Sequence, residues 1–254
     1  MLDISVDTDS KTYTLYLKLK DTLERYQTTM ATGEDLTLHF GDMVSLSYTN
    51  NNKIKPLYID FTKDKMFYRL QHTSKNKEPL VRAVMTGLDD KALVIDATAG
   101  LGRDSMVLQR FGSRVLMFER NVVIYALLHD ALDRARADES FMISMGTLPR
   151  LYNLGSIDGY AGDRPEVIYY DPMFPERKKS AMVKKDMQIL KALIGADEDV
   201  EVFLKKSLTL ATRRVVLKRP KTASLVSVDG IEPYSSTDGG NCRFDCYRAI
   251  SSII

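Results

Sequence analysis

The sequence has little cysteine and no long apolar segment. Two cysteines, Cys242 and Cys246, occur in 254 residues, which argues against a disulfide framework and favours a reducing cytoplasm. No apolar run approaches the roughly 20 residues of a membrane span, and the polar N-terminus lacks the apolar segment of a secretory signal peptide. We therefore expect a cytoplasmic protein with no membrane attachment.

Two kinds of ligand site are also missing. The three histidines, His39, His72 and His129, are scattered, and the two cysteines have no further cysteine near them. The pattern therefore predicts no metal site. No Gly-Lys-Ser or Gly-Lys-Thr triplet occurs, which excludes a P-loop nucleotide site.

The net charge is only +2, but the basic residues are unevenly distributed. The segment from Arg177 to Lys221 holds thirteen Lys or Arg and five Asp or Glu, so the remainder of the chain carries a net charge of −6. This distribution indicates an anionic partner, with nucleic acid as the leading candidate. The other interpretation is that these lysines cover solvated helix faces, and the charge pattern leaves both open.

The stretch 92–104, ALVIDATAGLGRD, organises the chain. An apolar run ends abruptly at Asp96, a turn of small residues follows, and a helix is expected to begin after the turn. A short apolar run between turn signals is typical of a strand buried on both faces. Gly100 and Gly102 allow a tight turn and a close approach to a ligand, and the helix presents free N–H groups. We therefore expect a nucleotide-like ligand on this turn.

Similar apolar runs recur along the chain, each ending in a polar or charged residue. The expected strands are Ala92–Ile95, Val115–Phe118, Phe141–Ser144, Val167–Tyr170 and Val215–Leu217, closed by a hairpin of Val226–Val228 with Arg243–Ile250. Asn121 is the expected N-cap of a helix after the second strand. This alternation predicts an open α/β sheet with helices on both faces and ligands beyond the carboxyl ends of its strands. Asp96, Glu119 and Asp171 are then expected to converge on one crevice.

The first seventy residues differ from the rest. Apolar and polar residues alternate over Tyr13–Leu19, Leu36–Phe40 and Val44–Tyr48, which predicts short strands. We therefore expect a small β-rich N-terminal subdomain over 1–70, followed by the α/β domain over 71–254.

Residues at the strand ends narrow the choice of ligand. Glu119, after the second strand, is the carboxylate expected on the ribose hydroxyls of either NAD or S-adenosylmethionine (SAM). Ser105 stands where a dinucleotide fingerprint has its third glycine. After the fourth strand comes DPMFP, 171–175, which resembles the Asp/Asn-Pro-Pro-Phe/Tyr motif of methyltransferases that act on exocyclic amino groups of bases. This motif favours SAM over NAD.

The chemistry of such an acceptor explains the motif. An aromatic amine is a poor nucleophile because its lone pair is delocalised into the ring. The carboxylate of Asp171 and the carbonyl of Pro172 are expected to accept its two N–H groups, which makes the nitrogen more pyramidal and fixes its direction. Phe174 is expected to stack on the base. These three are the candidate catalytic residues; the simpler interpretation is an Asp-Pro turn followed by a core phenylalanine.

Four separated motifs occur in the order found in one bacterial family. The chain resembles the ribosomal RNA small subunit methyltransferase J family in these motifs, which are DATAGLGRD at 96–104, FERN at 118–121, YYDPMFPERKKSAMVKKDM at 169–187 and ATRRVVLKRP at 211–220. The resemblance implies a Rossmann-like SAM-dependent methyltransferase that methylates N2 of one guanine in 16S rRNA. It also implies 16S rRNA, or the small ribosomal subunit, as the partner.

The resemblance further implies where the donor binds. The expected donor site consists of Asp96, Gly100, Gly102, Arg103, Asp104, Glu119, Arg120, Met145, Gly146 and Asp171. Met145 and Gly146 replace a pair of small residues, so their contacts are expected through the backbone. No metal is expected, because a sulfonium is already an activated leaving group, and no obligate protein partner is evident.

Three other functions stay open on the residues alone. A DNA or protein amino-group methyltransferase would share the donor site and the Asp-Pro motif. An NAD-dependent oxidoreductase would bind nicotinamide and not SAM. A non-catalytic RNA-binding module would keep its RNA affinity after Asp171→Ala.

Overall fold

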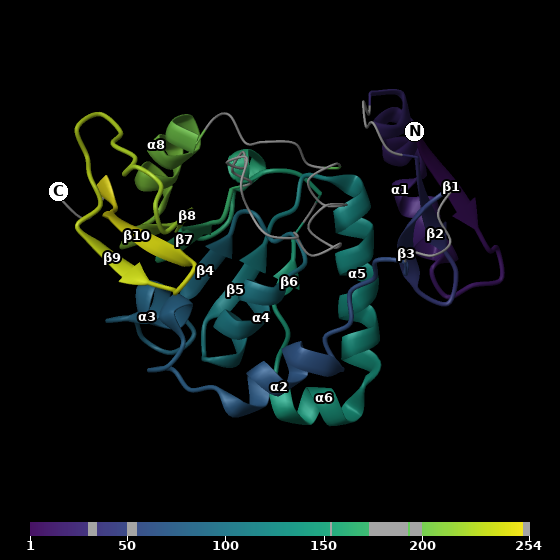
Figure 1. The fold of residues 1–254 in the computed structure, drawn as a ribbon, viewed down its shortest axis with the longest axis horizontal. Helices are drawn as coiled ribbons and strands as arrows, with labels where there is room; N and C mark the ends of the chain where they lie inside the picture. The colour runs from purple at the N-terminus through teal and green to yellow at the C-terminus, as the bar shows by residue number, and fades with distance from the viewer. Residues whose placement is uncertain (30–34, 50–54, 153, 173–192, 194–199, 251–254) are drawn as a thin grey trace.

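The computed structural model describes residues 1–29, 35–49, 55–152, 154–172, 193 and 200–250. Within these residues the strands form two sheets, one of three strands in the order β1-β2-β3 and one of seven in the order β6-β5-β4-β7-β8-β10-β9. Figure 1 shows the small sheet and α1 at one end of the molecule and the large sheet towards the other, with α5 between them.

The large sheet is mostly parallel. Its strands are β4 (Leu93–Asp96), β5 (Arg114–Met117), β6 (Arg150–Leu151), β7 (Val167–Tyr170), β8 (Arg214–Pro220), β9 (Ser235–Asp238) and β10 (Cys242–Arg248). β6, β5, β4, β7 and β8 run parallel, and β10 is antiparallel to both β8 and β9. The chain moves outward from β4 to β6 and then returns to β7 on the other side of β4. Such a reversal creates a crevice at the carboxyl ends of the central strands.

Helices cover both faces of this sheet. They are α2 (Asp64–His72), α3 (Pro79–Met85), α4 (Arg103–Arg110), α5 (Val122–Ala137), α6 (Glu139–Met145), the 3-10 helix η1 (Ile157–Gly159) and α8 (Val200–Leu210). Val94 of β4 belongs to the apolar cluster that includes α3, α4 and α5, whereas its neighbour Ile95 packs with α8 and η1. The predicted Rossmann-like α/β architecture is thereby confirmed. No helix in the described part of the chain has both the length and the apolar character needed to cross a membrane.

The N-terminal part contains a helix that the sequence pattern concealed. Its elements are β1 (Leu2–Val6), α1 (Tyr13–Thr29), β2 (Leu36–Phe40) and β3 (Val44–Tyr48). β2 and β3 match the predicted strands, but the strand predicted over Tyr13–Leu19 is wrong, because these residues begin α1. Leu15, Leu19 and Leu23 are buried one helical turn apart, while Leu17 is 54% exposed. Leu15 and Leu19, four residues apart, share a face in a helix and also in a strand. Leu17 would share that face only in a strand, so its exposure distinguishes the helix from the strand.

The small sheet packs against α5 through one continuous apolar cluster. A polar contact crosses the same boundary: Asp130 of α5 accepts a 3.1 Å hydrogen bond from the backbone N–H of Val44. Arg134 donates to Asp130 at 2.9 Å and to the carbonyl of Ile59 at 2.5 Å. These contacts anchor the N-terminal part to the large domain, and the boundary at residue 70 stays a prediction.

The third predicted strand, Phe141–Ser144, is also wrong. These residues lie in α6, where the side chain of Asp138 caps the helix by accepting a 2.9 Å hydrogen bond from the N–H of Phe141. Phe141 and Met145 are buried one turn apart, and Ile143 between them is exposed. The strand at this place in the sheet is β6, whose two residues are too few to form a periodic pattern.

Two further differences concern the C-terminal strands. Residues 226–228 are not a strand, since Val228 makes only an isolated bridge with Ile231. The partner of β10 is β9, a polar and mostly exposed edge strand without apolar alternation. β8 also continues to Pro220, beyond the predicted end at Leu217, so Lys218 lies within the strand.

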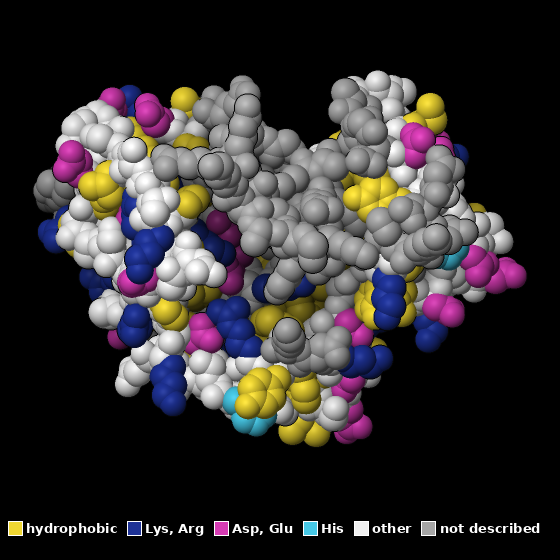
Figure 2. Space-filling view, viewed as in Figure 1, with side chains coloured by type: hydrophobic (Ala, Val, Ile, Leu, Met, Phe, Trp, Pro, Cys, Tyr) yellow, Lys and Arg dark blue, Asp and Glu magenta, His cyan; other side chains and the backbone are white. Residues whose placement is uncertain are grey.

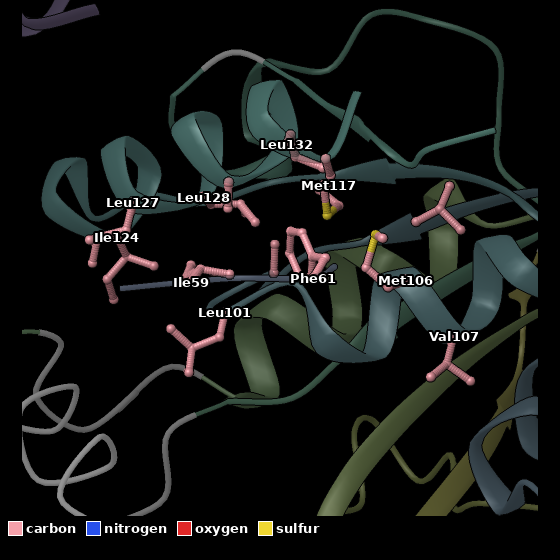
Figure 3. Packing of buried hydrophobic residues seen from close by; sticks show 14 of the residues in the cluster. Ile59, Phe61, Leu101, Met106, Val107, Met117, Ile124, Leu127, Leu128 and Leu132 are labelled. Carbon is pink, nitrogen blue, oxygen red and sulfur yellow. The ribbon is translucent and has the colours of Figure 1, made fainter. Parts of the chain in front are cut away.

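The turn after β4 packs tightly against α5. Gly102 has a φ of 70°, and a Cβ at this position would lie 2.7 Å from Leu128 Cδ1 and 3.0 Å from Phe61 Cζ. Figure 3 shows Phe61, Leu101 and Leu128 within one layer of packed side chains. The close approach at Gly102 is therefore to the protein's own core, and a ligand contact at this residue stays a prediction.

Candidate functional site

A cavity of about 320 Å³ opens at the carboxyl ends of β4, β5 and β7. The turn after β4 forms part of its wall, together with residues that follow β5 and β7 and side chains from α2, α4, α8 and β8. The volume lies in the range of small-molecule sites. Seven of the predicted donor-site residues line it: Asp96, Gly100, Arg103, Asp104, Glu119, Arg120 and Asp171.

The other three predicted donor residues do not line the cavity. Gly102 is the N-cap of α4 and faces α5. Met145 and Gly146 end α6 and are absent from the cavity wall. Because a helix occupies the place of the predicted strand, these two residues do not follow a strand at the carboxyl edge of the sheet. A residue that the sequence did not single out, Ser156, lines the cavity after β6.

The candidate catalytic residues begin at the end of β7. Asp171 lines the cavity, and its backbone N–H donates a 2.7 Å hydrogen bond to Thr98 Oγ1 in the glycine turn. Pro172 follows and is buried. Phe174 and the basic residues 177–185 lie outside the described residues. The described part of the motif is thus tied directly to the turn that follows β4.

Glu119 is held by backbone groups from two segments. Its Oε2 accepts a 2.9 Å hydrogen bond from the N–H of Gly100, and its Oε1 accepts a 2.7 Å bond from the N–H of Asn121. The side chain is buried, and burial raises the pKa of Glu119 although the backbone hydrogen bonds oppose the rise. Asn121 is the predicted N-cap of α5, and its side chain accepts from Val123 and Ile124. Glu119 therefore has a fixed position at the cavity wall.

Asp96 is the most deeply buried carboxyl group of the cavity. Its Oδ2 accepts a 2.5 Å hydrogen bond from Ser105 Oγ, and its Oδ1 accepts a 3.2 Å bond from the N–H of Thr98. Burial raises the pKa of Asp96 to about 7, against the opposing effect of the Ser105 hydrogen bond. Ser105, where a dinucleotide fingerprint has glycine, thus anchors the carboxyl group that ends β4.

Lys218 connects two carboxylates at the cavity wall. Its Nζ donates to Asp104 Oδ2 at 2.9 Å and to Asp171 Oδ2 at 2.8 Å. Burial alone would lower the pKa of Lys218, but the two carboxylates raise it above its ordinary value. The sequence analysis counts this lysine among the basic residues of 177–221, whose predicted partner is nucleic acid, whereas the structure pairs it with two carboxylates at the cavity wall.

Asp104 has further partners. Tyr169 donates a 2.7 Å hydrogen bond to Asp104 Oδ2, and Arg69 NH1 lies 3.9 Å from Asp104 Oδ1. Arg69 also pairs with both oxygens of Glu78, at 3.0 and 2.7 Å. Burial would raise the pKa of Asp104, but the charge of Lys218 and these contacts hold it below its ordinary value. Asp104 is therefore an ionised, fixed carboxylate.

Aromatic side chains supply the apolar part of the wall. Tyr170 and Phe203 stack with their ring centroids 3.9 Å apart, and both line the cavity, as does Phe118. Phe203 belongs to α8, far from the strand ends in sequence, and only the packing of α8 on the sheet reveals its place. Together with the carboxylates, these rings form a site suited to a flat, partly charged ligand.

The surface around the site does not carry one uniform charge. On the face drawn in Figure 2, Lys or Arg side chains and Asp or Glu side chains are interspersed over the part that the structure describes. Among all the residues that the structure describes, no group of three or more His, Cys, Asp or Glu side chains is placed to share a metal ion.

The sequence is similar to those of known methyltransferases. Residues 21–249 match the family model described as "Putative SAM-dependent methyltransferase". The chain is 40% identical over 216 residues to the ribosomal RNA small subunit methyltransferase J of Thioalkalivibrio sulfidiphilus, covering 82% of each chain. It is 36% identical over 245 residues to the protein of that name in Shewanella piezotolerans, covering 94% of this chain and 90% of the relative.

The fold has a solved counterpart. The crystal structure of a SAM-dependent methyltransferase from Neisseria gonorrhoeae superposes with a TM-score of 0.67 at 25% sequence identity. The superposition covers 98% of this chain and 96% of that one. The similarity therefore includes the N-terminal part as well as the large sheet.

Proposed function

The chain belongs to the ribosomal RNA small subunit methyltransferase J family of SAM-dependent methyltransferases, and from this membership we propose that it methylates the exocyclic N2 amine of a guanine in 16S rRNA. The family assignment removes the NAD-dependent oxidoreductase and the non-catalytic RNA-binding module from the possible functions. A DNA or protein acceptor becomes an outcome to be tested.

One observation carries the proposal: Asp171, which begins the Asp-Pro motif, lines the same cavity as Glu119 and the glycine turn. The groups expected to hold the donor and the group expected to orient the acceptor amine therefore share one site. The 2.7 Å bond from the Asp171 N–H to Thr98 fixes the acceptor motif relative to the donor turn. Direct transfer between two bound reactants requires this proximity.

The residues present fit SAM. Glu119 is an acceptor for ribose hydroxyls, and Arg120 lies beside it at the cavity wall. Arg103, with the N–H groups that begin α4, provides a positive site for the carboxylate of the donor. Asp104 and Asp96 are the carboxyl groups available near its ammonium. Phe118, Tyr170 and Phe203 offer apolar contact to a flat ring.

The proposed reaction needs little proton chemistry from the protein. SAM supplies a methyl group on a sulfonium, which leaves as a neutral thioether. The bond that forms joins the methyl carbon to guanine N2, the bond that breaks is the sulfur–methyl bond, and one amine proton is then released. Asp171 and the carbonyl of Pro172 accept the two N–H groups and orient the nitrogen lone pair. Phe174 is proposed to stack on the base.

The proposed acceptor is anionic and large. Basic residues follow Asp171 closely in the sequence, from Arg177 to Lys185, and RNA phosphates are their natural partners. We propose 16S rRNA or the small ribosomal subunit as the substrate, with the cytoplasm as the place of action. No metal ion, membrane or obligate protein partner enters this proposal.

Methyl transfer from labelled SAM tests the acceptor. The protein is incubated in separate reactions with 16S rRNA, small ribosomal subunits and DNA, and the labelled nucleoside is identified by mass spectrometry. Label is expected on N2 of one guanine in the rRNA, and Asp171→Ala is expected to abolish it. Label in DNA or protein alone would refute the rRNA assignment. In cells lacking the protein, undiminished N2-methylguanosine at every mapped 16S site would also refute the rRNA assignment.

A further inference from the structure

We propose that Lys218 is a positioning residue that joins the donor side of the site to its acceptor side. The inference rests on the proposed function, because it assigns Asp104 to the donor and Asp171 to the acceptor amine. Lys218 is not itself assigned a contact with either reactant. Its role is to hold the two carboxylates at a fixed separation.

The geometry of the contact comes from three separate elements. Asp104 lies in the first turn of α4, Asp171 follows β7, and Lys218 lies in β8. A single ammonium group donates to both carboxylates, at 2.9 and 2.8 Å. Three segments that are distant in the sequence therefore meet at one nitrogen atom.

The sheet register places Lys218 accurately. Tyr170 of β7 pairs with Leu217 of β8, so Asp171 and Lys218 are the next residues along two adjacent parallel strands. On the other side of β8, Lys218 pairs with Phe244 of β10. Lys218 is thus paired with β10 and directly follows the last residue paired with β7, which limits its freedom to shift and suits a positioning role.

The burial of the cluster makes the contact strong. The side chains of Lys218, Asp104 and Asp171 are 26%, 21% and 36% exposed. Tyr169 and Arg69 approach Asp104 from other directions. An ammonium between two partly buried carboxylates forms charge-assisted hydrogen bonds, and these are shorter and stronger than neutral ones. Loss of the cation would leave the two negative charges of Asp104 and Asp171 facing each other, with the Tyr169 hydrogen bond to Asp104 still joining α4 to β7.

Methyl transfer is sensitive to such a link. The nitrogen lone pair, the methyl carbon and the sulfur must lie nearly in line, and a displacement of about 1 Å can cost about 100-fold in rate. Asp104 and Asp171 are bound to the same nitrogen, so Lys218 fixes the separation of their carboxylates, in addition to the hydrogen bonds from Tyr169 to Asp104 and from the Asp171 N–H to Thr98. The expected defect of a Lys218 variant is therefore in kcat more than in KM.

Two substitutions test the role in methyl transfer to 16S rRNA. Lys218→Met removes the charge and keeps the chain length, and we expect kcat to fall about 100-fold while KM for SAM changes several-fold at most. Lys218→Arg keeps the charge, but the longer and planar guanidinium cannot occupy the position of the ammonium without shifting the carboxylates, so a fall of about tenfold is expected with an unchanged melting temperature. Lys20→Met, which removes an exposed lysine paired with Glu24 on α1, is the matched control.

The outcomes separate positioning from a general contribution to stability. Wild-type kcat in Lys218→Arg or in Lys218→Met would overturn the inference. A lower melting temperature with unchanged kcat in the folded fraction would also overturn it. If Lys218→Met does not fold, Lys218→Arg decides alone. An inactive wild-type enzyme on every rRNA substrate would instead refute the proposed function.

A binding measurement tests the link without turnover. The dissociation constant of S-adenosylhomocysteine is measured by calorimetry for wild type, Lys218→Met, Asp171→Asn and the double variant. Because both single changes break the same bridge, we expect the double variant to bind no more weakly than the weaker single variant within about twofold. Effects that multiply independently would contradict the bridge.

Discussion

The backbone N–H of Gly100 donates a 2.9 Å hydrogen bond to the carboxylate of Glu119. Gly100 belongs to the turn after β4, whereas Glu119 follows β5, so the bond joins the carboxyl ends of two neighbouring strands. The other oxygen of Glu119 accepts from the N–H of Asn121, which caps α5. One carboxylate therefore fixes the shape of the cavity wall on which the donor is proposed to bind.

Glu119→Gln is expected to weaken SAM binding. The amide replaces one acceptor oxygen by a donor, which must face either the N–H of Gly100 or that of Asn121. The neutral amide is also a weaker acceptor for the ribose hydroxyls of SAM, and a hydrogen bond to a charged group contributes about 1.5–3 kcal/mol, so the dissociation constant of SAM should rise at least about tenfold. Calorimetry measures the change, with Glu139→Gln, on the exposed first turn of α6, as control. Unchanged affinity would contradict the role of Glu119.

The two glycines of the turn are expected to differ in their tolerance of alanine. Both have positive φ, but a Cβ on Gly100 would find its nearest atom 3.8 Å away, whereas one on Gly102 would meet Leu128 at 2.7 Å. We expect Gly100→Ala to cost about 1 kcal/mol of unfolding free energy, from backbone strain alone. Gly102→Ala adds overpacking of about 1–3 kcal/mol. Urea unfolding of both variants checks that Gly102→Ala loses more unfolding free energy than Gly100→Ala. Equal losses would show that the side chains near Phe61 rearrange to accept the added methyl group.

Asp96 is expected to make the stability of the ligand-free protein depend on pH. Burial raises its pKa from 3.8 to about 7, so between about pH 4 and 7 the folded chain keeps a proton that the unfolded chain releases. The free energy of unfolding therefore falls across this window, by roughly 1.4 kcal/mol per pH unit for this group, and levels off above it.

Asp96→Asn provides the comparison for this pH dependence. Asparagine does not titrate, so the stability of wild type minus that of the variant should decrease from pH 5 to pH 7 and be constant above about pH 8. Urea unfolding at each pH, without SAM, gives the difference. A difference that is independent of pH would mean that Asp96 is ionised throughout.

Tyr26 is expected to stabilise the start of α5 from the N-terminal part of the chain. Its hydroxyl accepts a 2.8 Å hydrogen bond from Asn121 Nδ2 and donates a 3.0 Å bond to the carbonyl of Leu193. Tyr26→Phe leaves Asn121 with one partner fewer and should cost about 1–2 kcal/mol. Thermal or urea unfolding measures the loss, and Tyr58→Phe, at a half-exposed tyrosine, should leave stability unchanged. Equal stability in both variants would argue against this anchor.

Lys178 and Lys179 are expected to contact RNA phosphates. They lie outside the described residues, so the prediction rests on their place after the Asp-Pro motif. Replacing both by Gln should weaken rRNA binding and reduce the slope of log affinity against log salt by about 1–2, with SAM affinity unchanged. The double variant Lys18→Gln, Lys20→Gln removes the same charge from α1 and is the control. An unchanged salt slope would remove these lysines from the interface.

The central strands and the cavity residues that follow them were predictable from the sequence for a physical reason. A strand in the middle of a parallel sheet is buried on both faces, so Val167–Tyr170 forms an uninterrupted apolar run and β7 has the predicted bounds. Polar residues after such strands must reach the carboxyl edge, which brings Asp96, Glu119 and Asp171 together. Burial on both faces of the sheet therefore determines both the apolar composition of these strands and the position of the polar residues that follow them.

Other features depend on contacts that leave no local pattern. A lysine near a strand end has the same sequence context whether it is solvated or paired, so the bridge from Lys218 to Asp104 and Asp171 required the register of β7 with β8. α6 has no clear helical pattern in the sequence because its buried residues, Phe141 and Met145, span a single turn. The edge strand β9 is polar and carries no periodic signal.

The order of the last strands has a consequence for folding during synthesis. β10 lies between β8 and β9 but follows both in the chain. Until residues 242–248 are available, β8 has one unpaired side next to the apolar residues Val215, Val216 and Leu217. Open strand edges of this kind pair with other chains. A chain that stops before Cys242 is therefore expected to aggregate rather than to give a weakened enzyme.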